Sequence, residues 1–245
     1  SQTAVLLCEM TRRKIKVVFC DEQHNPHSEL LPYYGSHDTS IKVKKQIQWG
    51  EHIKEHVWTE IVSEKIRKQA CHLEDRGYLE RADMLRQYVR EMEFADANNR
   101  EGHAAKVYFN TLFGLDFTRS CENSINAALN YGYGILLSYF NREIVSNGYI
   151  TQIGLCHDNM FNQFNLASDL MEPFRTLVDR KVVIMQPEKF EHEEKMTLVS
   201  LMSDEVMIDG RHNFVSNAIR IYCRSIFDAL NENDISLIRF YQDEL

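Results

Sequence analysis

The sequence lacks the features that mark a membrane-spanning or a secreted protein. Its most apolar stretch, Gly132 to Phe140, is too short to cross a bilayer and is bordered by Asn130, Asn141 and Arg142. The first residues carry no basic segment ahead of their apolar run, so we expect no signal peptide. The six cysteines are scattered and form no C-x-x-C pair, which indicates reduced thiols inside the cell. We therefore expect a cytoplasmic protein.

Proline and glycine are also scarce, with four prolines and ten glycines in 245 residues. Only Pro173 and Pro187 occur beyond position 40, and because proline breaks helices, this scarcity favours long helices there. The chain has no P-loop, no G-x-G-x-x-G after a predicted strand and no G-x-S-x-G. These absences exclude the common nucleotide-binding loops and the serine-hydrolase elbow.

Positive charge is in short supply as well. The net charge is −8, with residues 1–50 at +2 and residues 51–245 at −10. An acidic protein does not coat nucleic acid indiscriminately. Any contact with nucleic acid therefore needs local basic patches or a partner protein.

The pattern of apolar residues predicts a mainly α fold behind a small β portion. Thr3 to Thr11 is predicted as a short helix, followed by a buried strand at Lys14 to Asp21 and an extended piece at Leu30 to Gly35. These two pieces cannot make a stable sheet alone, so upstream strands are missing or a partner completes the sheet. We assign residues 1–35 to the remaining part of a β domain, 36–41 to a linker and 42–245 to a multi-helical domain. Apolar residues from Ile47 to Ile66 keep helical spacing, and further helices are predicted at 67–95, 101–113, 121–147, 165–180, 187–203 and 211–230.

Three separated segments each supply a group that binds a hard or borderline divalent cation: Glu101, His157, and the pair Asp169 and Glu172. Two carboxylates and one imidazole suit Mg²⁺ or Mn²⁺ with positions left for phosphate and water, which indicates chemistry on phosphodiesters. Each residue also has an ordinary interpretation. An acid in a first helical turn is favoured by the helix dipole, and Glu172 with Arg175 makes a common i, i+3 ion pair. Only the combination of the three segments favours a metal site.

Two competing metal sites are weaker. His52 and His56 are spaced to share a helix face, but no third ligand accompanies them. The dipeptides His37-Asp38 and His157-Asp158 are typical of helical HD-type metal phosphohydrolases, which need further His and Asp ligands that the sequence does not place.

Taken together, the segments resemble a known family, the CRISPR spacer-acquisition integrases, the larger of the two universal adaptation proteins. The resemblance covers essentially the whole chain, and one further block, Asn25 to Gly35, resembles the type II-A branch. The family blocks are Phe19-Cys-Asp21, Glu101-Gly-x-Ala-Ala-x-x-Tyr-Phe, Asn126 to Leu136, Gly154-x-x-His157 and Asp169-Leu-Met-Glu172-Pro-Phe-Arg175.

The resemblance implies a function. The family's metal ligands fall on Glu101, His157 and Glu172, where other branches commonly have Asp in place of Glu172, and Asp169 matches an auxiliary acidic position. The implied reaction is attack of a prespacer 3′-hydroxyl on a phosphodiester at the repeat of a CRISPR array, with Mg²⁺ or Mn²⁺ and with associated endonuclease activity. The implied partners are double-stranded prespacer DNA, repeat DNA and a small ferredoxin-like adaptation protein in the bacterial cytoplasm.

The resemblance also implies a helical catalytic domain preceded by a β-sandwich that mediates homodimerisation, and this chain starts partway through that sandwich. Candidate DNA contacts are basic residues near the start of the chain and one near the acidic pair: Arg12, Arg13, Lys14, Lys16, Lys42, Lys44, Lys45 and Arg175. Two alternatives stay open, a helical metal-dependent phosphohydrolase or nuclease outside CRISPR, and a non-catalytic scaffold. The scaffold predicts full function after Glu172→Ala.

Overall fold

The computed structural model describes residues 3–13, 15, 17–20, 22, 26–30 and 36–242. The candidate DNA contacts Lys14 and Lys16 lie outside the described residues, as does most of the extended piece predicted at 30–35. Within the described part the protein is mostly helical, with one two-stranded ribbon and one three-stranded antiparallel sheet. The predicted mainly α fold is confirmed. No helix among these residues has the length and apolar character needed to cross a membrane.

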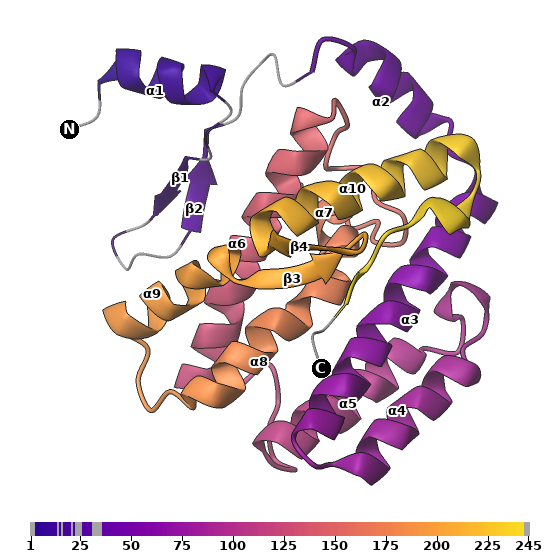
Figure 1. Ribbon diagram of the computed structural model, residues 1–245, viewed down its shortest axis with the longest axis vertical. Helices are drawn as coiled ribbons and strands as arrows, with labels where there is room; N and C mark the ends of the chain where they lie inside the picture. Colours follow the sequence, from indigo (N-terminus) through magenta and orange to yellow (C-terminus); the bar gives the residue numbers. More distant parts are fainter. Residues whose placement is uncertain are drawn as a thin grey trace.

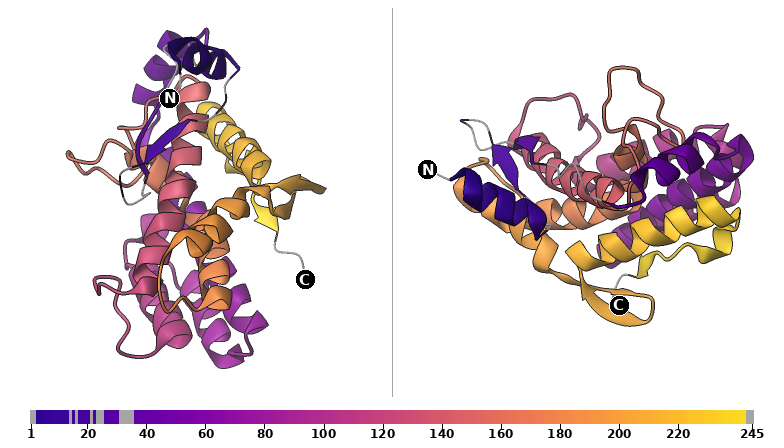
Figure 2. Two further views of the ribbon diagram at one scale, coloured as in Figure 1. Left: turned by 90° about the vertical axis from the view of Figure 1, so that its left-hand side faces the viewer. Right: turned by 90° about the horizontal axis from the view of Figure 1, so that it is seen from above.

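The N-terminal part is a short helix beside a β ribbon. Helix α1 (Ala4–Arg12) starts at Thr3, whose hydroxyl accepts the backbone N–H of Leu6 at 3.3 Å, as expected of an N-cap threonine. Strand β1 (Val18–Cys20) pairs antiparallel with β2 (Pro26–Glu29), and β2 contacts helix α6. In Figures 1 and 2, α1 and this ribbon lie at the end of the molecule opposite α4 and α5.

Helix α2 (Thr39–Ile47) begins inside the segment predicted to be a linker. The sequence Ser36 to Thr39 accounts for the early start, because the carbonyl of Asp38 accepts the first helical N–H groups and the Thr39 hydroxyl donates to the carbonyl of Ser36. Ile47, predicted to begin the apolar face of the next helix, is exposed at the end of α2. The chain turns at residues 48–50 before the next helix starts.

Helix α3 (Glu51–Asp75) is the longest helix and runs along α4 (Leu79–Arg90) and α5 (Arg100–Phe113). The predicted apolar spacing is confirmed, since the isoleucines and valine at 53, 57, 61 and 66 are buried. The single helix predicted at 67–95 is wrong. The chain reverses at Gly77, which has φ of +84°, a conformation that glycine adopts at little cost. A 3₁₀ turn, η1 (Phe94–Asp96), then leads into α5.

Helix α6 (Ser124–Ser146) packs closely against α8 (Arg175–Met185). A Cβ added at Gly132 would lie 2.4 Å from a methyl carbon of Val178, so the glycine allows the two helices to approach, as its place on the apolar face predicts. Leu129, Leu136 and Phe140 on the same face are fully buried in the core. This face is therefore the centre of the helical body.

The helix predicted at 165–180 is broken at Pro173. Helix α7 (Asn165–Leu170) ends there, a 3₁₀ turn η2 (Glu172–Phe174) follows, and α8 starts at Arg175. A proline in a helix interior removes a backbone donor and clashes with the preceding turn, which accounts for the break. The break therefore lies at Glu172 itself, the first residue of η2.

The C-terminal third departs most from the prediction. The helices predicted at 187–203 and 211–230 are present as α9 (His192–Ser200) and α10 (Val215–Glu232), each with a later start, and a 3₁₀ turn η3 (Leu201–Ser203) and an unpredicted hairpin lie between them. The hairpin joins β3 (Glu205–Ile208) to β4 (Arg211–Phe214), and after a last turn η4 (Ile235–Leu237) strand β5 (Tyr241–Gln242) pairs with β3. The sheet order is β4-β3-β5.

Candidate active site

Glu101 is positioned by a strained turn at the start of α5. Ala95, Asp96 and Asn99 all have positive φ, between 51° and 57°, which costs free energy for residues other than glycine. The Asp96 carboxylate offsets this cost by accepting the N–H groups of Glu101 at 3.1 Å and of the preceding residue at 2.7 Å. Asn99 is the N-cap residue of the helix. Glu101 therefore lies in the first helical turn, as predicted.

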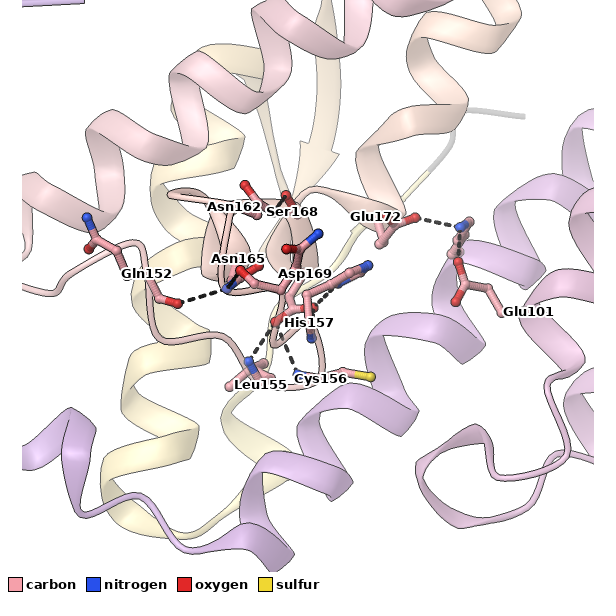
Figure 3. Close-up of polar contacts among 12 residues, drawn as sticks. Glu101, Gln152, Leu155, Cys156, His157, Asn162, Asn165, Ser168, Asp169 and Glu172 are labelled. Atoms are coloured by element: carbon pink, nitrogen blue, oxygen red, sulfur yellow. Dashed lines mark hydrogen bonds and ion pairs between the residues drawn. The ribbon is translucent and has the colours of Figure 1, made fainter. Parts of the chain in front are cut away.

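A buried carboxylate holds the loop that carries His157. Asp169, in α7, is fully buried and accepts the backbone N–H groups of Leu155 (2.6 Å), Cys156 (3.2 Å) and His157 (3.2 Å). Its Oδ1 also lies 2.5 Å from Nδ1 of the His157 ring. One carboxylate thus fixes both the loop backbone and the imidazole (Figure 3). This assigns a positioning role to the residue predicted as auxiliary.

The loop closes tightly over Gly154. A Cβ at this position would lie 2.4 Å from the carbonyl oxygen of His157 and 2.7 Å from Asp169 Oδ2, closer than real Cβ atoms come. We expect Gly154→Ala to lower the free energy of unfolding by about 1–3 kcal/mol, because the loop must shift to fit the methyl group. Urea denaturation measures this. Gly50→Ala, where a Cβ meets no atom within 4 Å, should cost less than about 1 kcal/mol, and equal costs at the two positions would contradict the prediction.

The His157 ring is presented by two neighbours. Its edge packs against the buried Trp58 ring of α3, with centroids 5.8 Å apart and planes at 86°. The hydrogen bond with Asp169 raises the pKa of His157, and the carboxylates of Asp169, Glu172 and Glu101 act in the same direction while burial opposes it. Because Nδ1 faces a carboxylate, the neutral ring carries its proton there and leaves Nε2 as an acceptor. Metal-ligating histidines commonly have this arrangement.

Glu101 and Glu172 meet at one buried cation that sequence reasoning missed. The Nζ atom of Lys65, in α3, lies 2.5 Å from Glu101 Oε1 and 2.5 Å from Glu172 Oε2. The two carboxylates, labelled in Figure 3, come from different elements, α5 and η2. Arg175 binds the second oxygen of Glu172 at 2.8 Å. Three distant parts of the chain therefore converge at one cluster.

The charges of this cluster support one another. Burial acts to lower the pKa of Lys65, but the Glu172 and Glu101 carboxylates outweigh it and hold that pKa above its usual value. Burial likewise acts to raise the pKa of Glu172, but Lys65 and Arg175 outweigh it and hold that pKa below its usual value. Both groups are therefore charged at neutral pH. Each charge stabilises the other, because burying a charge without a partner costs free energy of folding.

The donor set fits a hard or borderline divalent cation, although the side chains are not arranged around one. Among the residues that the structure describes, no group of three His, Cys, Asp or Glu side chains is placed to hold a metal ion directly. Glu172 Oε2 is nevertheless buried, and the Nζ atom of Lys65, 2.5 Å away, is the cation that faces it. With Glu101 and the open Nε2 of His157, the cluster offers two carboxylates and one imidazole, as predicted for Mg²⁺ or Mn²⁺.

The competing metal pair does not form such a cluster. His52 and His56 stack edge to face with ring centroids 4.5 Å apart, and both rings pack against Phe94. The His37-Asp38 dipeptide precedes α2, where the Asp38 carboxylate accepts a hydrogen bond from Ser36. These histidines therefore belong to packing and to a helix start.

The candidate DNA contacts are divided between two places. Arg12 and Arg13 lie exposed at the end of α1 and pair with Glu9. Arg175 lies at the cluster, where its guanidinium packs over the Tyr133 ring at 4.8 Å. Lys42, Lys44 and Lys45 lie on α2. Of the candidate contacts within the described residues, the structure brings only Arg175 to Glu101 and Glu172.

Lys65 had a signal in the sequence. It follows Trp58 and Ile61 and precedes His72 at the spacing of one helix face, and all of these side chains are buried. A lysine on an apolar face needs an anionic partner, because burying a lone ammonium is costly. The pattern of carboxylates and histidines alone does not show that Lys65 needs an anionic partner.

A second buried carboxylate lies beneath Arg175. Tyr133 donates a hydrogen bond to Asp179 at 2.5 Å. Burial raises the pKa of Asp179 to about 6, although hydrogen bonds from Tyr133 and Tyr108 oppose the shift. A carboxyl whose pKa is raised on folding stabilises the fold when protonated. This contribution is complete below the ordinary pKa near 4 and is lost as the pH rises through about 6.

Asp179→Asn should therefore change the pH dependence of stability. Relative to the unaltered protein, we expect the free energy of unfolding of the variant to gain on the order of 3 kcal/mol between pH 4 and pH 7, because the amide does not ionise. Urea denaturation at each pH measures the difference. Asp83→Asn, at an exposed carboxylate on α4, is the control. A constant difference between Asp179→Asn and the unaltered protein over this range would show that Asp179 does not titrate as stated.

Known proteins resemble this chain in sequence and in fold. The CRISPR associated protein Cas1 family profile matches residues 1–209. The "CRISPR-associated endonuclease Cas1" of Neisseria meningitidis serogroup C (strain 8013) is 34% identical over 215 residues, which cover 86% of this chain and 71% of the relative. The Francisella tularensis subsp. novicida (strain U112) protein "CRISPR-associated endonuclease Cas1 1" is 24% identical over 241 residues, covering 88% and 74%.

Two solved structures share the fold over nearly the whole chain or all of it. A chain of a Cas6-RT-Cas1–Cas2 complex superposes with a TM-score of 0.75 at 19% identity, covering 99% of this chain and 31% of that longer one. A casposase bound to integration product superposes with a TM-score of 0.67 at 18% identity, covering 100% and 84%. At these identities the two structures establish the fold, and the profile and the meningococcal relative establish the family. The chain belongs to the CRISPR associated protein Cas1 family.

Proposed function

We propose that the chain is the metal-dependent DNA integrase of CRISPR adaptation, which joins prespacer 3′-OH ends into the repeat of a CRISPR array and has associated endonuclease activity. Family membership supports this proposal, as does the endonuclease name of the meningococcal relative. The fold is compatible with it, since a casposase bound to integration product shares that fold. The observation that carries the proposal is the convergence of Glu101 and Glu172 at one cation, beside an imidazole fixed by Asp169.

The proposed reaction is a transesterification. The prespacer 3′-hydroxyl gives up its proton as its oxygen forms a bond to the phosphorus of a repeat phosphodiester. The bond from that phosphorus to its bridging 3′-oxygen breaks, and the released oxygen takes up a proton, so that one 3′-hydroxyl is consumed and one is formed. No oxidant or nucleotide triphosphate is consumed. With water in place of the 3′-hydroxyl, the same bond cleavage is endonuclease activity. In such phosphoryl transfers the protein mainly positions reactants and neutralises developing charge.

Glu101, Glu172 and Nε2 of His157 are the groups that would hold Mg²⁺ or Mn²⁺. When bound there, the ion supplies Lewis-acid neutralisation of charge on the phosphate oxygens. Asp169 keeps the proton of the neutral imidazole on Nδ1, so that Nε2 stays open. Arg175 fixes Glu172 through its second oxygen and adds positive charge beside the phosphate position.

The partners belong to the same proposal. The chain carries a net charge of −8, so it needs help to hold DNA. We infer that it acts as a homodimer in the bacterial cytoplasm with a small ferredoxin-like adaptation protein, on double-stranded prespacer DNA and repeat DNA. A Cas1–Cas2 complex among the solved structures that share this fold supports the partner.

An integration assay tests the proposal. The protein and its small partner are incubated with a 3′-OH duplex and a supercoiled CRISPR-array plasmid, with Mn²⁺ or EDTA. We expect Mn²⁺-dependent joining at the repeat edge that falls about 100-fold in His157→Ala, because one ligand contributes several kcal/mol and each 1.4 kcal/mol is tenfold. His192→Ala, at the exposed start of α9, should retain full activity. Nicking without joining would favour a nuclease, and DNA binding without reaction would favour a scaffold.

A further inference from the structure

A buried lysine stands between the two carboxylates of the candidate active site. The Lys65 side chain is 9% exposed, and its Nζ lies 2.5 Å from both Glu101 Oε1 and Glu172 Oε2. A lysine ammonium is strongly hydrated in water, so it is buried only where anions replace its water. The two carboxylates come from α5 and η2, and the lysine comes from the middle of α3. The ammonium is therefore the cation that now holds these elements together.

We propose that the Lys65 ammonium occupies the place of a divalent cation between Glu101 and Glu172, and that a metal ion binds there by displacing it. The inference rests on the proposed metal site and adds a residue that controls it. Lys65 then has two effects. It stabilises the metal-free fold, and it lowers the affinity of the site for metal.

The charge of the cluster supports displacement. Glu101 and Glu172 already face two cations, Lys65 and Arg175, so the cluster is neutral without a metal. A divalent ion that entered beside the ammonium would leave two excess positive charges in a buried place. Like charges a few ångströms apart repel strongly in such surroundings. Asp169 does not offset this excess, because its carboxylate already serves three backbone N–H groups and the imidazole.

The chemistry of the two side chains indicates which cation is the easier to displace. Arg175 pairs with Glu172 Oε1 at 2.8 Å, and its guanidinium also packs over the Tyr133 ring at 4.8 Å. Lys65 pairs with Glu172 Oε2 at 2.5 Å through a single compact ammonium. Its flexible four-carbon stem also allows the ammonium to move without moving α3. Oε2 of Glu172 and Oε1 of Glu101 then become available as oxygen ligands.

Mn²⁺ binding to the protein without DNA tests the inference. Free Mn²⁺ is measured by electron paramagnetic resonance, and the melting temperature is followed in parallel. We expect Lys65→Met to bind Mn²⁺ at least about tenfold more tightly than the unaltered protein, a change of ~1.4 kcal/mol. We expect Lys65→Arg to bind it more weakly, because a guanidinium makes two parallel bonds to carboxylates and is harder to displace. Without metal, the Lys65→Met protein should melt at a lower temperature than the unaltered protein. Mn²⁺ should raise the melting temperature of the variant by more than it raises that of the unaltered protein.

A matched control separates displacement from general loss of charge. Lys68 lies one turn further along α3 and is equally buried, but it pairs with Glu64 and packs over the ring of Tyr241. Lys68→Met should leave the Mn²⁺ affinity within about twofold of the unaltered protein, because it loses the same charge away from the site. Equal tightening by Lys68→Met would overturn the inference.

The remaining outcomes distinguish this inference from the proposed function. One outcome is that the unaltered protein binds Mn²⁺, the Glu101→Gln variant does not, and Lys65→Met binds it no more tightly than the unaltered protein. The proposed metal site then stands and the inference on Lys65 is wrong. A Lys65→Met protein that stays unfolded at saturating Mn²⁺ also overturns it, because the metal then does not replace the ammonium. If no form of the protein binds Mn²⁺, both proposals fail together.

Discussion

Replacing Asp169 with alanine should lower the free energy of unfolding by about 3–5 kcal/mol and slow DNA joining about 100-fold, as far as the loss of His157 itself. The carboxylate is fully buried and accepts three backbone N–H groups, from Leu155, Cys156 and His157, as well as the His157 ring. Each buried donor left without a partner costs about 1–3 kcal/mol. Without these hydrogen bonds the loop conformation is no longer stabilised, and His157 loses the contact that fixes its proton on Nδ1.

Two further variants separate the loop from the ring. Asp169→Asn keeps the shape of the side chain but replaces one of its two acceptor oxygens by an NH₂ group, which then faces N–H donors. We expect this variant to be less stable than the unaltered protein and to join DNA more slowly. Asp158→Ala removes an exposed carboxylate from the same loop and should change neither property. Urea denaturation and the joining assay give the two readouts. An Asp169→Ala protein of normal stability and activity would mean that the loop is held by other contacts.

Most of the helical body could be predicted from the sequence, because its signals are local. Gly132 on the apolar face of α6 predicts close packing of another helix, and the structure has Val178 of α8 at this position. Asn99 before Glu101 predicts the start of α5, and Pro173 predicts the break at Glu172. These features depend on spacing and backbone chemistry within one turn, which a single sequence displays.

The missed hairpin also had a local signal. Asp209 and Gly210 join β3 to β4 with φ of 53° and 70°, and Asp-Gly between short alternating runs is a strong indication of a two-residue hairpin turn. The helix predicted at 211–230 starts four residues too early and takes in β4, and the prediction leaves residues 204–210 outside any element, so it lacks the hairpin. The helix predicted at 67–95 runs across Gly77 and so lacks the break between α3 and α4.

The candidate site could be predicted in part only. Glu101, His157 and Glu172 follow from ligand chemistry and from the family resemblance, and the structure brings the two glutamates to one cation. The roles of Asp169 and Lys65 depend on contacts between segments that lie 12 to 107 residues apart in the chain. No local pattern records such contacts. Lys65 could be suspected from its buried helix face, but its partners could not be named.

Glu172→Gln is expected to be the most damaging conservative change in the protein. The Glu172 side chain is 3% exposed and is bound by Lys65 on one oxygen and Arg175 on the other. Removing its charge leaves two buried cations with one partner fewer, which typically costs 3–5 kcal/mol of stability. Joining should fall at least about 1000-fold, because the amide is a poor ligand for Mg²⁺ or Mn²⁺ and no longer offsets the charge of Arg175.

Two glutamates serve as matched controls for the separate effects. Glu101 is 28% exposed, so Glu101→Gln should slow joining by a similar factor while the free energy of unfolding falls by less than about 1 kcal/mol. Glu143, on α6, is as buried as Glu172 and pairs with Arg142 outside the site, so Glu143→Gln should cost stability and leave joining intact. Thermal denaturation and the joining assay on all three variants give the pattern. Full joining by Glu172→Gln would establish that the buried cluster is structural and that the chemistry lies elsewhere.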